Sequence, residues 1–196
     1  QVKADIASEE NIPVLKLNAV KKFVTGIYPY SIMTSTFSPI NKEEDALKGT
    51  NSVQEWCGQT YLQLNNRTDF ELTGHSYFAS EGDVETTLKK TWLEDELWNR
   101  IRINPEELPT GDVSIIPSFE FLRLRHKEAM AYNGYAKLQQ RDSLTSYSIE
   151  YPELQRSLVI YFNSTFPFEI EKWEETNASQ SLDTTSLKTS AVRLRR

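Results

Sequence analysis

The amino-acid sequence predicts a mainly β protein of the α+β class, in which an antiparallel curved sheet or half-open β-barrel carries one main amphipathic helix. Three observations predict this fold class. Residues 52–80 hold two strand-like stretches on either side of a polar turn, as in a hairpin. Residues 83–102 change to the spacing of a helix, and residues 144–162 return to the alternation of strands.

The composition is that of a globular chain. Of the 196 residues, 38% are hydrophobic and 26% are charged, and we expect one β-rich domain spanning residues 1–196. The formal net charge of −6 argues against a nucleic-acid partner, because phosphate binding needs a concentrated basic surface. The single cysteine, Cys57, excludes an internal disulfide.

The first strands are short and polar. Residues 14–16 and 19–24 are extended candidates, and residues 28–40 are rich in Ser, Thr and aromatic side chains, which favours a strand. Residues 41–51 are polar and predict a loop.

Residues 52–80 give the clearest hairpin. The turn is predicted at residues 65–69, where Asn, Asp and Thr gather. We expect Leu64 to lie opposite Phe70, because this register gathers the apolar side chains on one face. The members of that face would be Trp56, Leu62, Leu64, Phe70, Leu72 and Phe78.

The predicted helix covers residues 83–102. Apolar residues recur every fourth position, and Asn104-Pro105 would end the helix. We expect its outer face to be acidic and solvated. The side chains expected to pack on the sheet are Leu88, Trp92, Leu97 and Ile101.

The rest of the chain predicts a meander of strands. Residues 118–127, 144–151 and 156–162 alternate, and so do residues 166–173. A Ser/Thr-rich loop at residues 177–185 precedes a last possible strand at residues 187–194.

Cys57 and His75 are weak catalytic candidates. In the expected register they would be diagonal neighbours on one face of the hairpin, roughly 7–8 Å apart. A catalytic dyad needs the imidazole to accept the thiol proton. The alternative is a partly buried free thiol beside a surface histidine.

The stripe of Arg123, Arg125 and Lys127 is a candidate ligand-binding surface, together with Phe119 and Phe121. Strand alternation would place all five side chains on one side, where cations and aromatic rings could hold an anionic or glycan ligand. The alternative is that the basic residues pair with acids such as Glu150 or Glu169 on neighbouring strands.

Other chemistry has little support in the sequence. Carboxylates cluster at residues 94–96 and 169–175, but glycosidase chemistry needs two carboxyl groups at a fixed separation. The two histidines, His75 and His126, lack the spacing of a metal site, so we expect no metal and no cofactor.

Four segments carry a resemblance to a known family: residues 18–31, the Gln54-Glu55-Trp56-Cys57-Gly58 motif, residues 93–98 and residues 108–111. Together they resemble uncharacterised exported proteins and lipoproteins of Bacteroidota, some of which carry the label septum formation inhibitor. The resemblance covers most of the chain. It implies export to the periplasm or outer membrane of a Gram-negative bacterium, with a lipid anchor outside this sequence and a chain that extends beyond both ends.

The sequence favours a non-enzymatic cell-envelope protein that binds or carries an apolar or amphipathic ligand, such as a lipid or a glycan. Membrane contact would come only through the lipid anchor. One alternative is a hydrolase that uses Cys57 and His75. Another is a scaffold that docks a partner protein through the acidic helix.

Overall fold

The computed structural model describes residues 4–6, 8–41, 45–178 and 186–194. The chain divides into two compact units, the first formed by residues 1–99 and 116–130 and the second by residues 100–115 and 131–196. The expectation of one β-rich domain stays a prediction. Most of the predicted loop at 177–185 lies outside the described residues.

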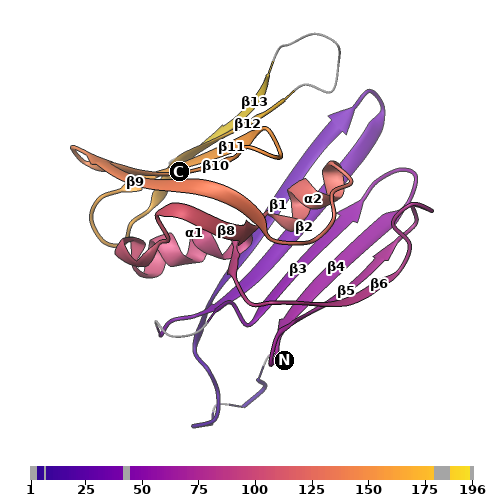
Figure 1. Ribbon diagram of the computed structural model, residues 1–196, viewed down its shortest axis with the longest axis horizontal. Helices are drawn as coiled ribbons and strands as arrows, with labels where there is room; N and C mark the ends of the chain where they lie inside the picture. Colours follow the sequence, from indigo (N-terminus) through magenta and orange to yellow (C-terminus); the bar gives the residue numbers. More distant parts are fainter. Residues whose placement is uncertain (1–3, 7, 42–44, 179–185, 195–196) are drawn as a thin grey trace. The chain divides into compact units, whose positions relative to one another are not determined.

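The first unit is built on an antiparallel sheet whose six strands follow one another in chain order, β1 to β6. The strands are β1 (Val14–Thr25), β2 (Tyr28–Pro39), β3 (Lys48–Gln54), β4 (Gln59–Asn66), β5 (Phe70–Ser76) and β6 (Val84–Leu88) (Figure 1). The strands predicted at 14–16, 19–24 and 28–40 are confirmed within β1 and β2. Lys48 to Asn51, predicted as loop, belong to β3.

Tight turns join the strands at one end of this sheet. Gly26 and Ile27 connect β1 to β2, and Gly26 has φ +63°, a conformation that glycine adopts without strain. Gln54 pairs with both Ser31 and Gln59, so the β3–β4 turn lies at the same end as the β1–β2 turn.

The β4–β5 hairpin forms, but the predicted register is wrong by two residues. Leu64 pairs with Leu72, and Phe70 pairs with Asn66 across a shorter turn. A shift of two residues keeps each side chain on its face of the sheet, because strand side chains alternate. Leu64, Phe70 and Leu72 are accordingly buried, whereas Trp56 lies outside the strands and is exposed.

The helix predicted at 83–102 begins eleven residues later, at Glu94. Residues 84–88 form β6 and Trp92–Leu93 form the short strand β7, while helix α1 spans Glu94–Ile103. A spacing of four residues fits one face of a helix and one face of a strand, since four is a multiple of two. The predicted burial of Leu97 and Ile101 and the stop at Asn104-Pro105 are confirmed.

The first half of α1 is fastened to the first unit by buried polar side chains. Glu96 accepts hydrogen bonds from the backbone N–H of Ala46 and Leu93 at 3.0 and 3.1 Å, and Asp95 accepts one from Phe119 at 3.0 Å. The expectation of a solvated acidic face is therefore wrong. These carboxylates cap backbone donors in the interior, where an unpaired N–H would be costly.

Asn99 makes the matching contacts to the strands. Its Nδ2 donates to the carbonyl oxygens of Leu15 and Thr36 at 3.1 and 3.3 Å and to Ser38 Oγ at 3.0 Å. Asn99 is 3% exposed, so these bonds connect α1 to β1 and β2 away from water.

The strand predicted at 118–127 is wrong, because helix α2 occupies Phe119–Leu124. Ser118 caps it by accepting a hydrogen bond from the N–H of Phe121 at 3.2 Å. The alternating aromatic residues resemble a strand face, but Pro117 and Ser118 form a helix start that outweighs it.

The second unit contains a separate antiparallel sheet in the order β13-β12-β11-β10-β9-β8. Its strands are β8 (Gly111–Ile116), β9 (Tyr132–Arg141), β10 (Leu144–Tyr151), β11 (Arg156–Asn163), β12 (Ile170–Asn177) and β13 (Leu187–Val192), after the single turn η1 (Pro105–Glu107). β10 and β11 confirm the predicted strands at 144–151 and 156–162, and β13 lies within the predicted 187–194. β8 and β9 were not predicted, and β12 begins four residues later than expected.

The core of the second unit follows the predicted faces of β10 and β11. The buried side chains are Tyr147, Ile149, Tyr151, Leu158, Ile160 and Phe162. The Tyr147 hydroxyl donates to the carbonyl oxygen of Pro109 at 2.7 Å, which satisfies the polar end of an otherwise apolar position.

The mainly β fold class with one main helix is confirmed. Within the described part of the chain, neither sheet closes into a barrel. None of the described helices is long and apolar enough to span a membrane.

Replacement of Asn99 by alanine is expected to destabilise the first unit by about 2 kcal/mol, because buried acceptors in β1 and β2 lose their donor. Urea denaturation followed by circular dichroism measures the change. The exposed Asn133 on β9 is the control, and N133A should lie within about 0.5 kcal/mol of the wild type. Equal effects of the two substitutions would contradict the anchoring role.

Candidate ligand-binding groove

The first unit contains a groove with a volume of about 570 Å³. Strands β4 to β6 form one side, and Leu122 and Arg123 of α2 with residues 126–129 form the other. This volume lies in the range of small-molecule binding sites, about 300–1,000 Å³.

The floor of the groove is apolar because of strand alternation. Val84 pairs with Gly74, and Thr86 pairs with Leu72, so the inner face of β6 continues that of β5. A Cβ atom on Gly74 would lie 2.9 Å from Leu62 Cδ1, so glycine allows the leucine to lie across this position. The apolar lining side chains are Leu62, Leu72, Val84, Leu88 and Leu122.

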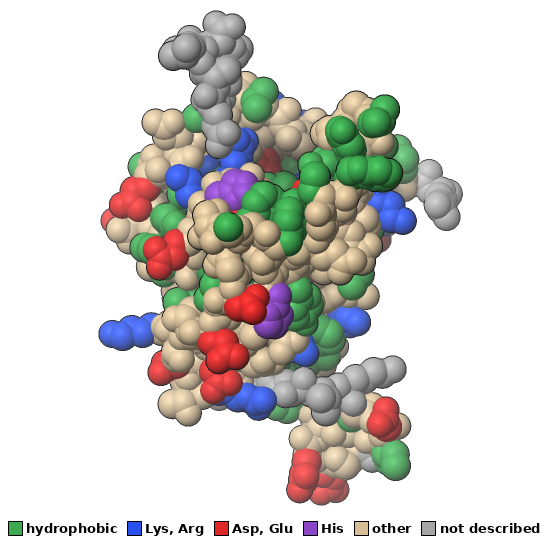
Figure 2. Space-filling view, turned by 90° about the vertical axis from the view of Figure 1, so that its right-hand side faces the viewer, with side chains coloured by type: hydrophobic (Ala, Val, Ile, Leu, Met, Phe, Trp, Pro, Cys, Tyr) green, Lys and Arg blue, Asp and Glu red, His purple; other side chains and the backbone are tan. Residues whose placement is uncertain are grey.

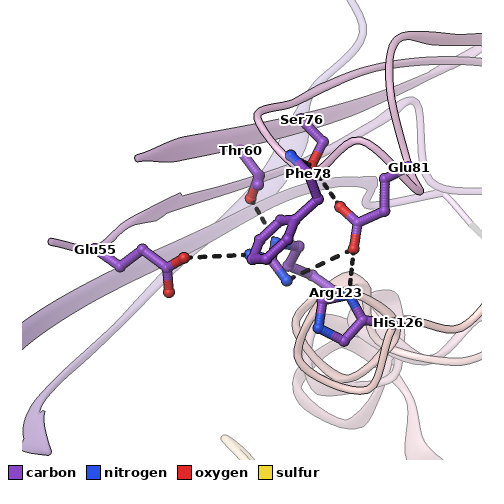
Figure 3. Close-up of polar contacts among 7 residues, drawn as sticks. All are labelled: Glu55, Thr60, Ser76, Phe78, Glu81, Arg123 and His126. Atoms are coloured by element: carbon purple, nitrogen blue, oxygen red, sulfur yellow. Dashed lines mark hydrogen bonds and ion pairs between the residues drawn. The ribbon is translucent and has the colours of Figure 1, made fainter. Parts of the chain in front are cut away.

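Arg123 stands at one end of the groove and is held from several sides (Figure 3). Its Nε donates to Thr60 Oγ1 at 3.1 Å, and its terminal nitrogens lie 3.6 Å from a Glu55 oxygen and 3.7 Å from a Glu81 oxygen. The guanidinium also lies over the ring of Phe78, at 4.3 Å from its centroid. The side chain is 10% exposed, so these groups replace most of its water.

Glu81 connects this arginine to the groove wall. One carboxylate oxygen contacts both Arg123 and His126 Nδ1, the latter at 2.5 Å, and the other accepts a hydrogen bond from Ser76 Oγ at 2.5 Å. The ring of His126 meets that of Phe78 edge to face, with centroids 5.0 Å apart. Figure 3 shows the carboxylate between the histidine and the serine.

The cluster favours the charged form of the Glu81 carboxylate. Partial burial would raise the pKa of Glu81, but the hydrogen bonds from Ser76 and His126 and the charge of Arg123 together lower this pKa. The negative charge of Glu55 is the largest cause that raises the pKa of the Tyr30 hydroxyl. Arg123 therefore lies between two carboxylates and presents little free charge to an anionic ligand.

The structure places the two weak catalytic candidates in different surroundings. Cys57 is exposed in the turn between β3 and β4. His75 lies on β5 opposite Tyr61, with its Nδ1 3.1 Å from Asp83 Oδ1. Among the described residues, no hydrogen bond joins Cys57 to His75.

The predicted basic and aromatic stripe is divided by the helix. Phe119 and Phe121 are buried in α2 and offer no ring to a ligand. Arg123 pairs with Glu55 and Glu81 rather than with Glu150 or Glu169. Arg125 is the C-cap of α2, and Lys127 lines the groove.

Glu81 and His126 were missed as site residues, because each stands in an irregular segment. Glu81 follows β5, and His126 follows α2 with φ +51°, which is unusual for a residue other than glycine. A left-handed residue just after a helix is a known position for a chain reversal, but no sequence pattern pairs it with a glutamate 45 residues away.

The carboxylates near the C-terminus form ion pairs. Arg193 contacts both Glu169 and Glu171, at 2.6 and 3.3 Å. Hydrogen bonds from Lys172 and Lys188 lower the pKa of Glu174 to about 2. Within the described residues, no group of three or more His, Cys, Asp or Glu side chains could hold a metal ion.

No protein-family model matches this chain, and neither a curated protein nor a solved structure matches it. The groove must therefore be interpreted from its own geometry.

Replacement of Glu81 by glutamine is expected to remove a pH-dependent part of the stability. The pKa of Glu81 is lowered in the folded chain, so its contribution is present above the ordinary value of 4.5 and is lost as the pH falls through the lowered pKa. E81Q should therefore be less stable than the wild type at pH 7, and the difference should shrink in acid. Urea denaturation between pH 7 and pH 2 measures it, with the exposed Glu153 as control (E153Q). A difference that grows in acid would contradict this assignment.

Replacement of Cys57 by serine is expected to leave any esterase or thioesterase activity unchanged, because His75 is directed to Asp83. Hydrolysis of p-nitrophenyl acetate by C57S and by the wild type measures this. Loss of a measurable activity in C57S alone would support the hydrolase hypothesis instead.

Proposed function

We propose that the first unit is a non-enzymatic binding module for an amphipathic ligand, which it holds in the groove of β4 to β6. The observation that carries the proposal is an apolar floor that ends at a charged rim whose members neutralise one another. Such a site can desolvate an aliphatic chain without stranding a charge.

The two ends of the groove differ in chemistry. An aliphatic segment would pack against Leu62, Leu72 and Leu88, where burial of each methylene group is worth about 0.8 kcal/mol. A polar end would lie near His126 and Lys127, which are exposed to solvent and line the same groove. A ligand with a chain and a hydrogen-bonding head, such as a fatty acid, matches both parts.

Binding in the groove is better supported than docking through the helix. The docking hypothesis needs an exposed acidic face, whereas Asp95 and Glu96 are buried and capped onto backbone N–H groups. On the family resemblance described above, we further propose that this module belongs to an exported cell-envelope protein.

Replacement of Val84 by glutamate is expected to weaken ligand binding at least tenfold, because a bound aliphatic chain would have to strip water from the new carboxylate. Titration with cis-parinaric acid, a fluorescent fatty acid, measures the affinity. Val84 lies on the edge strand β6 and is 37% exposed, so the substitution adds a charge without opening the core.

The matched control is Val20, an exposed valine on the opposite edge strand, β1. V20E should bind the probe as the wild type does. Equal affinity of V84E, V20E and the wild type, or no saturable binding by any of them, would refute the proposal.

A further inference from the structure

An exposed apolar surface lies at the end of the first-unit sheet where the β1–β2 and β3–β4 turns meet. We call it the tip patch, and it consists of Ile27, Tyr28, Trp56 and Tyr77. Ile27 is 82% exposed and Trp56 is 70% exposed, and the rings of Tyr28 and Trp56 lie 6.0 Å apart. Figure 2 looks at the side on which these turns lie in Figure 1, and hydrophobic side chains gather on it.

The turns that carry the patch are free of exposed charge. Residues 23–31 contain no charged side chain, and neither do residues 56–58. The adjoining acid, Glu55, is turned inward to Arg123, and its side chain is only 9% exposed. The nearest cation before the turn is Lys22, which is exposed on β1. The two turns thus present aromatic and aliphatic side chains, with a cation on β1 just before the first turn.

The tip patch is continuous with the wall of the groove. The ring of Tyr77 packs on the α-carbon of Gly58, where an added Cβ would lie 2.6 Å from the ring. Tyr77 in turn contacts Phe78, with ring centroids 4.1 Å apart, and Phe78 contacts His126, which lines the groove. A row of three rings, Tyr77, Phe78 and His126, therefore leads from Gly58 in the β3–β4 turn to the candidate site.

We propose that the tip patch inserts into the surface of a lipid bilayer and that the first unit takes its ligand from there. This inference rests on the proposed function and names the source of the ligand. Tyrosine and tryptophan suit the boundary between acyl chains and water, because their rings are apolar and their polar atoms can stay hydrated. Binding to such an interface strengthens with the apolar area buried and with the attraction of cations to anionic lipids.

A bilayer fits this surface better than a protein partner does. The two turns that carry most of the patch contain no exposed charge that would orient a protein partner. The row of rings joins the tip patch to an apolar groove. One class of molecule, an amphipathic lipid, would suit both the patch and the groove. A protein partner would account for the patch and leave the groove without a role.

The test is sedimentation of the chain with vesicles of phosphatidylethanolamine and phosphatidylglycerol. The double variant I27S/W56S should partition at least tenfold less than the wild type, because it removes the two most exposed members of the patch. In the wild type, vesicles should also shift the tryptophan emission to shorter wavelength, and the double variant should lose that shift.

The matched control is V20S/M33S. Val20 and Met33 are exposed and pair with each other across β1 and β2, away from the turns. This variant should partition as the wild type does. No vesicle binding by the wild type, or equal losses in both double variants, would overturn the inference.

Two further measurements separate the possible failures. I27S/W56S should still bind cis-parinaric acid in lipid-free buffer, and V84E should still bind vesicles, since one variant leaves the groove intact and the other leaves the patch intact. If the wild type binds the probe but does not bind vesicles, the membrane inference alone is refuted. A wild-type dimer that I27S/W56S converts to a monomer, measured by analytical ultracentrifugation, would assign the patch to a second copy and also overturn it.

Discussion

The buried guanidinium of Arg123 is the constraint on which the groove end of the first unit depends. A cation so far removed from water is tolerated only with counter-charges and hydrogen bonds close to it. Glu55 provides one charge from the β3–β4 turn, and Glu81 provides the other from the loop after β5. Helix α2 is therefore connected to both loops. The same contacts that neutralise the arginine position the groove rim and leave Trp56, the neighbour of Glu55, projecting outward.

Much of the fold could be predicted from the alternation of apolar residues, because alternation decides which face of a strand is buried. In β10 and β11 the predicted bounds and the predicted inward faces agree with the structure, with Tyr147 and Ile160 paired in the core. The errors arose where the same pattern fits two structures. Val84 and Leu88 share a face in a helix and in a strand, and the β4–β5 register shifts by two while Leu64, Phe70 and Leu72 stay on the buried face.

The candidate site could not be predicted in the same way, because its residues come together only through the tertiary fold. Arg123 and Thr60 lie 63 residues apart, and His126 and Glu81 lie 45 apart. The sequence does mark Arg123 and Lys127 as notable cations, but it does not show that α2 replaces a strand. Because Phe119 and Phe121 are buried in α2, Arg123 at the end of this helix lies against the sheet. Its contacts with Thr60, Glu55 and Glu81 result from that position.

The groove and the tip patch both expose apolar side chains to water, which costs free energy. Val84 and the members of the tip patch leave apolar area in water, and each 100 Å² of such area costs about 2.5 kcal/mol relative to burial. Scattered exposure of this kind is ordinary, but here the rings of Tyr77 and Phe78 connect the tip patch to His126 in the groove wall. A chain that needed only a stable sheet could place polar residues at the turn and on the outer half of β6 at no cost to its core. Apolar groups nevertheless stand at both places, and the adjoining charges are paired inward. This arrangement supports the proposal that lipid covers the surface.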